Sequence, residues 1–498
     1  MIRAFKNSRP IFAGCVLIFI LFASILSACS KKDVKPAPPG VTGTKPVVVV
    51  VKDTTVSISI DRSQKLQQID GFGFFGGRAP WWADASEIYS DDWANQVIND
   101  LGITIWRNEL YSDSPDQDAT WDKQRPVVEG LNKVAKAAKV PLKFIFTVWS
   151  PPANLKCKIG ADNKPISGTP NPTGTKNGGA LDPAKYTEYG NYLANGLQLY
   201  KDAGVNVYAI SPQNEPLFVE PYNSCVYNNM DGSYAAMLAN VIPVVKSKFP
   251  GVKVFGAENM LDMEGGKDRQ YFYNTSIKNS PDALKNIDIW AMHGYTEGIN
   301  PSSGSVLEGL WNTVKTEYIT PTQKPAWMTE TSGYDDNWLK TGKSPGAMDL
   351  ASDIQSALYY GQASAWVWWE ASDKNINEYT LMAANIKGKK YYASKHFYRF
   401  IRPGARMVKL NFKSTDHVTA TAFENTQMNS FTIVLINSSA NNVKLDLNGD
   451  NLPDNYDYYY TTSAVGDNCK KKDGRVKKTD IVLPPYSVVT LVNGNVFE

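Results

Sequence analysis

Two short motifs each place a glutamate at the end of an apolar, strand-like run. Residues 211–216 read Ser-Pro-Gln-Asn-Glu-Pro and contain Glu215, and residues 327–333 read Trp-Met-Thr-Glu-Thr-Ser-Gly and contain Glu330. A carboxylate at the C-terminal end of a barrel strand faces the mouth where such barrels hold their active sites. Two such carboxylates predict hydrolysis of a glycosidic bond with retention, in which one acid protonates the leaving oxygen and the other attacks the anomeric carbon.

Strand-like runs alternate with amphipathic helical patterns from Gly71 onward. The helical patterns lie at residues 92–101, 186–203, 234–248 and 347–360. Eight strand–helix repeats over about 320 residues predict an α/β fold, a (β/α)₈ TIM barrel, with a doubly wound sheet as the alternative. The strand-like runs lie at residues 71–75, 104–110, 142–149, 205–211, 252–257, 287–295, 325–330 and 364–370.

The pattern changes after the Arg-Pro-Gly sequence at residues 402–404. Short runs separated by turns predict an all-β module over residues 399–498. The run at residues 55–60 alternates with period two and has no place in the barrel, so residues 53–69 are expected to join this β-sandwich. The catalytic barrel is then expected over residues 70–398. The runs of the module lie at residues 418–423, 430–436, 442–447, 455–461 and 487–492.

Residues 1–28 have the pattern of a targeting segment, with basic residues before an apolar run. The segment leads into Leu-Ser-Ala-Cys, which resembles a bacterial lipobox and predicts that Cys29 is lipidated. We therefore expect an exported protein, anchored by lipid at the bacterial cell envelope, at the outer membrane. The alternative is a signal anchor or an ordinary signal peptide, although the apolar run is short for a membrane span. Residues 29–52 predict a flexible tether.

The charge balance argues against a nucleic-acid partner. The chain has 52 basic and 49 acidic side chains, and loss of Arg3, Lys6 and Arg9 with the targeting segment leaves 49 of each. A neutral protein has no global field that would steer it to a polyanion. Aromatic residues make up 12% of the chain and can stack on sugar rings, although a well-filled core also uses them. We expect a monomer with a polysaccharide substrate.

Three cysteines remain after the targeting segment and Cys29: Cys157, Cys225 and Cys469. An odd number in an exported protein leaves one or three free thiols. Cys157 and Cys225 follow successive barrel strands, which favours a bridge between them.

Other motifs point to no cofactor and no metal. The Gly-Phe-Gly-Phe-Phe-Gly at residues 71–76 matches a dinucleotide fingerprint, but its two Phe would crowd a pyrophosphate, so a turn that lines the cleft is the better interpretation. The chain has three His and no motif of a zinc hydrolase or serine esterase. His293 is interpreted as a packed, hydrogen-bonded residue. Residues 446–457 resemble a calcium loop imperfectly, and a hairpin turn is the simpler interpretation.

The motifs together resemble glycoside hydrolase family 30, within the clan of (β/α)₈ retaining glycosidases. The resemblance covers residues 55–498 and implies a barrel with a side-attached β-sandwich built from both chain ends. It rests on Ile-Asp-Gly-Phe-Gly at 69–73, Trp-Ser-Pro-Pro at 149–152, the motif at 211–216, Thr-Glu at 329–330 and Phe-Ile-Arg-Pro-Gly at 400–404.

This resemblance implies roles for individual residues. Glu215 is the implied acid/base and Glu330 the implied nucleophile. The early Gly-Phe-Gly and the Trp-Ser-Pro-Pro look most like the endo-xylanase branches. Members specific for glucuronoxylan carry an Arg soon after the eighth strand, whereas residues 370–374 contain none, which puts strict dependence on glucuronate in doubt. The positions that match substrate-binding residues are Arg107, Trp149, Asn214, Tyr295 and Trp369.

The expected mechanism is double displacement. The negative charge of Glu330 should raise the pKa of Glu215, and the two carboxyl groups should lie about 5–5.5 Å apart. Glu109, Glu258 and Glu370 also end strands and are either structural or substrate-binding. The alternatives are a β-1,6-glucanase or β-1,6-galactanase, an exo-acting glycosidase, and a non-catalytic, glycan-binding surface lipoprotein.

Overall fold

The computed structural model describes residues 54–76, 90–110, 121–171, 173–218, 223–227, 232–262, 273–295, 306–413 and 417–496. Within these residues, eight parallel strands close into a barrel in the order β10, β11, β12, β2, β3, β4, β8 and β9. Each strand coincides with one predicted run, so the predicted barrel is confirmed and the doubly wound sheet is wrong. The strands are β2 (Gly71–Phe75), β3 (Ile105–Glu109), β4 (Lys143–Thr147), β8 (Val207–Ser211), β9 (Lys253–Met260), β10 (Ile289–Gly294), β11 (Ala326–Thr331) and β12 (Ala365–Trp368).

Side chains of the barrel strands alternate between two cores. Ile105, Ala209 and Trp327 belong to a cluster inside the barrel. Trp106 and Ile210 belong to the larger cluster that the strands share with the surrounding helices. Successive side chains of a strand point to opposite faces, so a closed barrel covered by helices buries both sets.

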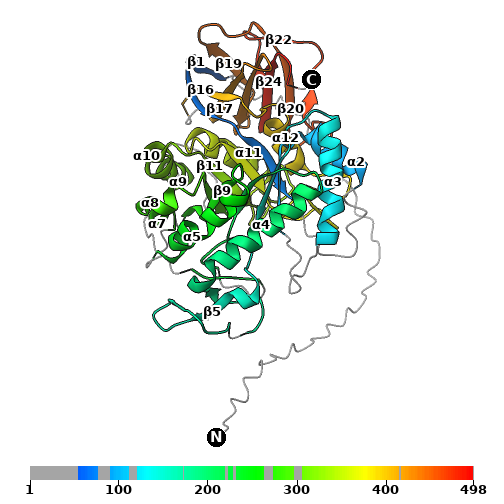
Figure 1. The fold of residues 1–498 in the computed structure, drawn as a ribbon. Helices are drawn as coiled ribbons and strands as arrows, with labels where there is room; N and C mark the ends of the chain where they lie inside the picture. The colour runs from blue at the N-terminus through cyan, green and yellow to red at the C-terminus, as the bar shows by residue number, and fades with distance from the viewer. Residues whose placement is uncertain are drawn as a thin grey trace, which may run out of the picture. The chain divides into compact units, whose positions relative to one another are not determined.

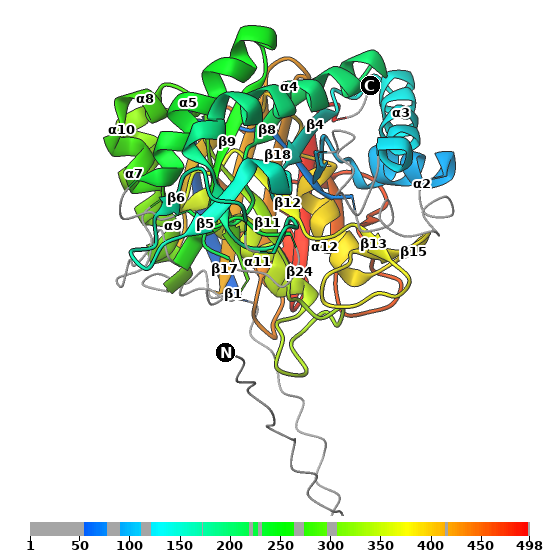
Figure 2. The ribbon, with the colours of Figure 1, turned by 60° about the horizontal axis from the view of Figure 1, so that its bottom comes forward.

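Helices pack around the barrel, as Figure 2 shows for α3, α4, α5 and α7. The helix α4 buries Tyr189, Leu193 and Leu197 along one face, at the spacing that 3.6 residues per turn requires. The four helical segments predicted from the sequence are all present. The helices include α2 (Asp91–Asn95) running into η2 (Gln96–Leu101), α3 (Trp121–Ala137), α4 (Tyr186–Asp202), α5 (Ser233–Lys248), α7 (Tyr273–Asn279), α8 (Pro281–Leu284), α9 (Val306–Val314), η5 (Lys315–Ile319), α10 (Thr320–Thr322), α11 (Ala347–Tyr359) and α12 (Lys389–Tyr398).

A second, mixed sheet forms the module that we call the β module. Its first strand β1 (Thr54–Gln68) pairs antiparallel with β16 (Arg406–Asn411) and parallel with β19 (Val443–Asn448). Figure 1 shows this strand beside strands from the other end of the chain. The β module therefore combines the start of the described chain with its end. Its other long strands are β17 (Val418–Asn425), β18 (Ser430–Asn437), β20 (Asn455–Thr461) and β24 (Ser487–Asn493).

The connection from β19 to β20 is not the hairpin turn that its sequence suggests. In the order of the sheet these two strands are far apart, since β1, β16, β17, β18 and β24 lie between them. The connection therefore crosses between distant strands. Among the described residues, the group that gathers three possible metal ligands lies in the barrel and not in this connection.

The predicted Cys157–Cys225 bridge is wrong. Cys157 pairs with Ala180 in an antiparallel ladder, and on the far side of that short strand Val226 N–H donates to Gly179 O (3.0 Å). Two strand spacings separate the cysteines by roughly 10 Å, beyond the roughly 7 Å that a disulfide can bridge between Cα atoms. In the described part of the chain, the free and buried thiols are Cys157, Cys225 and Cys469.

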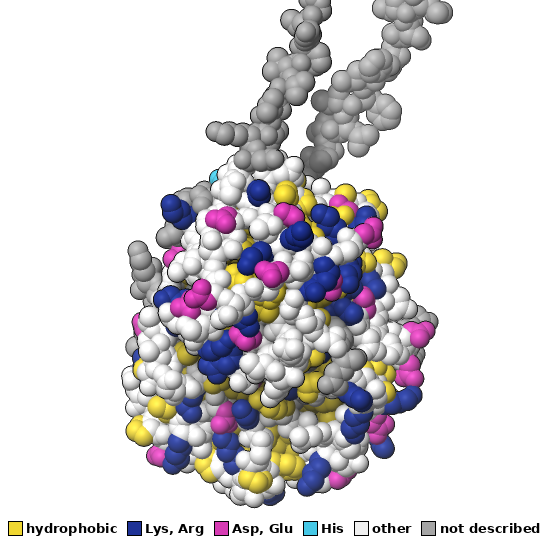
Figure 3. Space-filling view, turned by 90° about the horizontal axis from the view of Figure 1, so that it is seen from above, with side chains coloured by type: hydrophobic (Ala, Val, Ile, Leu, Met, Phe, Trp, Pro, Cys, Tyr) yellow, Lys and Arg dark blue, Asp and Glu magenta, His cyan; other side chains and the backbone are white. Residues whose placement is uncertain are grey.

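The targeting segment, Cys29 and the tether lie outside the described residues. Over the residues that the structure does describe, no helix is both long and apolar enough to cross a membrane. On the face in Figure 3, Lys and Arg side chains lie among Asp and Glu side chains. This mixture agrees with the charge balance of the sequence.

Candidate active site

A cluster of polar side chains lies at the carboxyl ends of the barrel strands, which is the end where such barrels hold their active sites. Glu215 follows β8 on a tight turn and has a backbone φ of 38°, which residues other than glycine adopt uncommonly. Asn214 N–H donates to Val148 O (2.8 Å), and Phe218 N–H donates to Glu215 O (2.9 Å). These bonds hold the turn that presents Glu215. The cluster comprises Arg107 on β3, Asn214 and Glu215 after β8, Glu258 on β9, His293 on β10, Tyr295 after β10 and Glu330 on β11.

Glu215 and Glu330 are close enough for double displacement. A carboxylate oxygen of each, together with a ring nitrogen of His293, lies within 4.8 Å of the others. Carboxyl groups of retaining enzymes lie about 5–5.5 Å apart, and those of inverting enzymes about 6.5–9.5 Å. The side chains of Glu215 and Glu330 are 11% and 7% exposed, whereas that of Glu258 is fully buried. Substrate can therefore reach the first two carboxylates but not the third.

Arg107 contacts three members of the cluster through its guanidinium group. Its Nη1 donates to Glu330 Oε2 (2.6 Å), and its Nη2 donates to Asn214 Oδ1 (3.0 Å) and Glu258 Oε1 (2.9 Å). The amide oxygen of Asn214 is thereby engaged, which leaves its Nδ2 available for a sugar hydroxyl. Tyr295 Oη donates to Glu330 Oε1. Burial and the charge of Glu330 raise the pKa of Tyr295 well above its usual value, so Tyr295 remains a neutral donor.

His293 and Glu258 belong to the cluster, although the sequence does not single them out. His293 is buried and hydrogen-bonded, as expected, but its partners place it in the active site. Its Nδ1 contacts Glu215 Oε1 (2.8 Å), and its Nε2 contacts Glu258 Oε1 (3.4 Å). Thr147 Oγ1 also donates to Glu258 (3.2 Å). The only signal in the sequence was their position at strand ends, which they share with Glu109 and Glu370.

The electrostatics favour a protonated Glu215. Burial raises its pKa most, the charge of Glu330 adds to that, and the hydrogen bond from His293 opposes it. The predicted direction is therefore present, with burial rather than Glu330 as its main cause. Burial alone would lower the pKa of His293, but Glu330, Glu215 and Glu258 raise it to about 9. The cations Arg107 and His293 then face the carboxylates of Glu258 and Glu330, and Glu215 can remain neutral.

This raised pKa predicts a pH-dependent stability. His293 stabilises the fold fully below its unfolded pKa of about 6.5 and loses that contribution as pH rises through about 9. The free energy of unfolding of the wild type should fall by up to about 3 kcal/mol across that range. Denaturant titrations at pH 6.5 and 10 measure this change. His293→Asn should abolish this change in the free energy of unfolding. His417→Asn, at an exposed position, should preserve it. An equal change between pH 6.5 and 10 in both variants would exclude His293 as the source.

Three aromatic rings form a wall beside the carboxylates. Phe75 stacks on Trp369 with ring centroids 4.1 Å apart, and Trp149 lies 5.7 Å from Phe75 and 6.1 Å from Trp369. The guanidinium of Arg107 lies 5.2 Å from the Trp149 ring centre. Trp149 and Trp369, two of the positions that match substrate-binding residues in the resemblance, therefore lie in one cluster with Phe75.

The glycines of residues 71–76 serve packing between strands rather than phosphate binding. A Cβ on Gly73 would lie 1.8 Å from Ile105 O, and one on Gly76 would lie 2.1 Å from the ring of Trp106. These close approaches of β2 to β3 require glycine.

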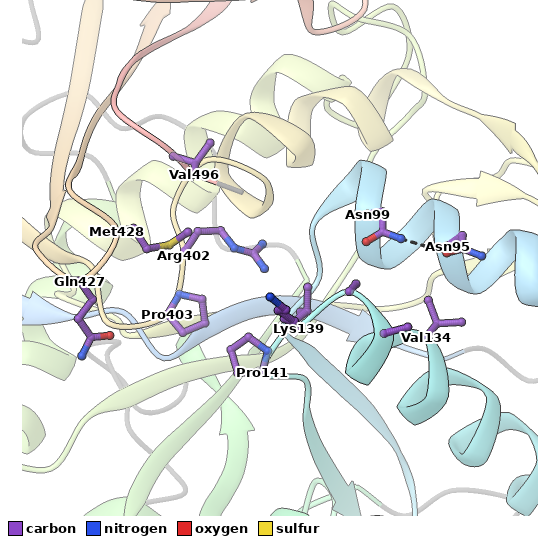
Figure 4. A pocket seen from close by; sticks show the side chains of 13 residues that line it. Asn95, Asn99, Val134, Lys139, Pro141, Arg402, Pro403, Gln427, Met428 and Val496 are labelled. Carbon is purple, nitrogen blue, oxygen red and sulfur yellow. Dashed lines mark hydrogen bonds between the residues drawn. The ribbon is translucent and has the colours of Figure 1, made fainter. Parts of the chain in front are cut away.

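A cavity of about 590 Å³ lies away from this cluster. Figure 4 shows Lys139, Pro141, Arg402 and Pro403 among the residues that line it. Lys139 and Pro141 precede β4, so the cavity lies at the amino end of the barrel strands, opposite the catalytic end. It is therefore not part of the active site.

Comparisons with known proteins agree with this geometry. No family model matches the chain. The chain is 26% identical over 402 residues to the glucuronoxylanase XynC of Bacillus subtilis (strain 168), covering 79% of each chain. It shares its fold with a GH30 endoxylanase from Clostridium papyrosolvens C71 (TM-score 0.68, 21% identity, 88% of this chain and 100% of that chain) and with an endo-β-1,6-glucanase (TM-score 0.63, 18% identity, 90% and 96%). These findings confirm the resemblance of the chain to glycoside hydrolase family 30.

Proposed function

We propose that the protein is a retaining glycoside hydrolase that cleaves internal glycosidic bonds of xylan. The observation that carries this proposal is the pair of accessible carboxylates, Glu215 and Glu330, each of which has an oxygen within 4.8 Å of an oxygen of the other. Arg107 and Tyr295 hold Glu330, which attacks, and burial raises the pKa of Glu215, which favours its protonated form.

In the first step, a carboxylate oxygen of Glu330 attacks the anomeric carbon and forms a glycosyl ester. The bond to the leaving oxygen breaks as Glu215 transfers its proton to that oxygen. In the second step, Glu215 removes a proton from water, the water oxygen attacks the anomeric carbon, and Glu330 leaves as a carboxylate. Once Glu330 is esterified its charge is gone, so the pKa of Glu215 falls and Glu215 can act as a base.

His293 and Arg107 position these two groups. The charged His293 donates from Nδ1 to Glu215 Oε1, which directs the acidic proton to the other oxygen, Oε2. Arg107 binds one oxygen of Glu330 and Tyr295 binds the other.

The names of similar proteins support xylan as the substrate, since they include a glucuronoxylanase and a GH30 endoxylanase. We expect the purified protein to release xylo-oligosaccharides from both glucuronoxylan and arabinoxylan, because residues 370–374 contain no Arg that would demand glucuronate. Chromatography of the products measures this. If the protein cleaves neither xylan but cleaves β-1,6-glucan, the substrate named in a similar structure, the proposed substrate is wrong and the proposed mechanism stands. If the wild type cleaves no glycan, and if wild type and Glu330→Gln bind a glycan equally well, the protein is a glycan-binding protein and not an enzyme.

We also propose that the protein is exported and anchored to the cell envelope through lipid on Cys29. The support is the sequence alone, in which Cys29 follows Leu-Ser-Ala after a basic and apolar segment. Metabolic labelling with palmitate should place the label on the wild type and not on Cys29→Ala, and the variant should leave the membrane fraction. Equal labelling of the two proteins would overturn the anchor. Cys469→Ala is the matched control.

A further inference from the structure

Two exposed aromatic rings flank the active site. Among the described residues, Phe218 and Tyr379 are the only Phe, Tyr or Trp side chains that are exposed, at 51% and 41%. Both follow the carboxyl end of a barrel strand, Phe218 after β8 and Tyr379 after β12. Both exposed aromatic rings in the described part of the chain therefore lie at the catalytic end of the barrel.

These rings lie on opposite sides of the barrel mouth. In the closed order of the described barrel, β2, β3 and β4 separate β12 from β8 in one direction, and β11, β10 and β9 separate them in the other. A line from Phe218 to Tyr379 therefore crosses the mouth, where Glu215 and Glu330 lie.

Phe218 sits on an anchored turn next to the acid. Its N–H donates to Glu215 O (2.9 Å), and Pro216 O accepts bonds from Tyr227 N–H (3.0 Å) and Tyr273 Oη (3.3 Å). The preceding Leu217 packs against the barrel core, so the exposed ring is the next side chain along a fixed backbone. Because Glu215 protonates the leaving oxygen, this ring lies on the side of the leaving group.

Tyr379 is anchored beside the aromatic wall. Its carbonyl oxygen accepts bonds from Trp368 Nε1 (2.6 Å) and Glu370 N–H (2.5 Å), the two neighbours of Trp369. The buried Lys390 binds the carbonyl oxygens of Tyr334 (2.8 Å) and Asn377, which ties this loop to the loop after β11. The exposed ring is thus held near Trp369 on a rigid support.

We propose that Phe218 and Tyr379 are stacking platforms at the two ends of an open groove, Phe218 for sugars of the leaving group and Tyr379 for sugars on the glycone side. This inference rests on the proposed function and deepens it, because sugar platforms on both sides of the scissile bond bind the interior of a chain. A pocket that releases single sugars has no use for the second platform. Each ring covers the apolar C–H face of a pyranose, and stacking buries apolar surface that is otherwise exposed.

The test uses the purified full-length protein and xylohexaose labelled at its reducing end. Phe218→Ala should lower kcat/KM on xylohexaose by roughly tenfold, from the lost burial of one ring face. It should move the cut toward the labelled end, because fewer sugars are then held on the leaving-group side. Tyr379→Ala should move the cut the opposite way. Opposite shifts cannot arise from general damage to the fold.

Two controls separate the platforms from other effects. Phe218→Trp keeps an aromatic ring at this position and should restore both the wild-type cut and the wild-type kcat/KM on xylohexaose. Val465→Ala removes an apolar side chain that is 89% exposed in the β module and should change neither measure. Unchanged cutting positions in both alanine variants would overturn the platforms alone. A wild type that leaves xylohexaose intact would overturn the proposed function itself.

Discussion

Replacing Glu330 with Gln should lower kcat on xylan by about 10⁴-fold or more and leave the protein folded, because an amide cannot form the glycosyl ester. No neighbouring carboxylate can take over: Glu258 is fully buried and bonded to Arg107. The amide oxygen of the introduced Gln can still accept a hydrogen bond from Arg107, and Arg107 remains paired with Glu258. We therefore expect only a small loss of stability.

The matched control is Glu378→Gln, the same change at an exposed position in the loop after β12. It should retain wild-type kcat and melting temperature. Azide should rescue Glu330→Ala by attacking from the vacated side, which gives a glycosyl azide of inverted configuration. Activity near that of the wild type in Glu330→Gln would mean that another group attacks the anomeric carbon.

Replacing Glu215 with Gln should lower kcat on xylan by roughly 10²- to 10⁴-fold, because the sugar alkoxide then leaves without a proton. The decrease in the rate of the first step should be much smaller for an aryl glycoside with an acidic phenol as leaving group. Steady-state and burst kinetics on the two substrates measure the contrast. An equal loss of the first step on both would show that Glu215 does not protonate the leaving group.

The pH profile gives a second test of Glu215. Burial and the charge of Glu330 raise its pKa, so the acid stays protonated to higher pH than an ordinary Glu. Wild-type activity should fall as pH rises through this pKa, since the first step needs the protonated form. Glu215→Gln should lose that alkaline decline on the aryl glycoside.

The barrel and its two central acids were predictable because both leave local signals. Each barrel strand is a short apolar run, and Glu215 and Glu330 follow such runs within distinctive neighbours. The roles of Glu258 and His293 depend on distances across the barrel. Both residues end strands, but Glu109 and Glu370 do so too, and the sequence cannot show which side chains contact Glu215.

Neither the Cys157–Cys225 bridge nor the hairpin turn over residues 446–457 is present, because neighbours along the chain are not neighbours in the sheets. Cys157 and Cys225 follow successive barrel strands, yet the strand that contains Ala180 lies between them. The connection over residues 446–457 has the composition of a turn, yet the strands it joins are not neighbours in the sheet. Both depend on sheet order, which local composition does not encode.

The central claim is that Glu330 forms a covalent bond to the anomeric carbon of a xylan-derived sugar. A 2-deoxy-2-fluoro-β-xylobiosyl fluoride tests it most directly, because the fluorine at C2 slows the second step and lets the glycosyl ester accumulate. After digestion, mass spectrometry should locate one added fluoroxylobiosyl group on Glu330, with none on Glu258. A label on another carboxylate, or an active enzyme that acquires no label, would contradict the account.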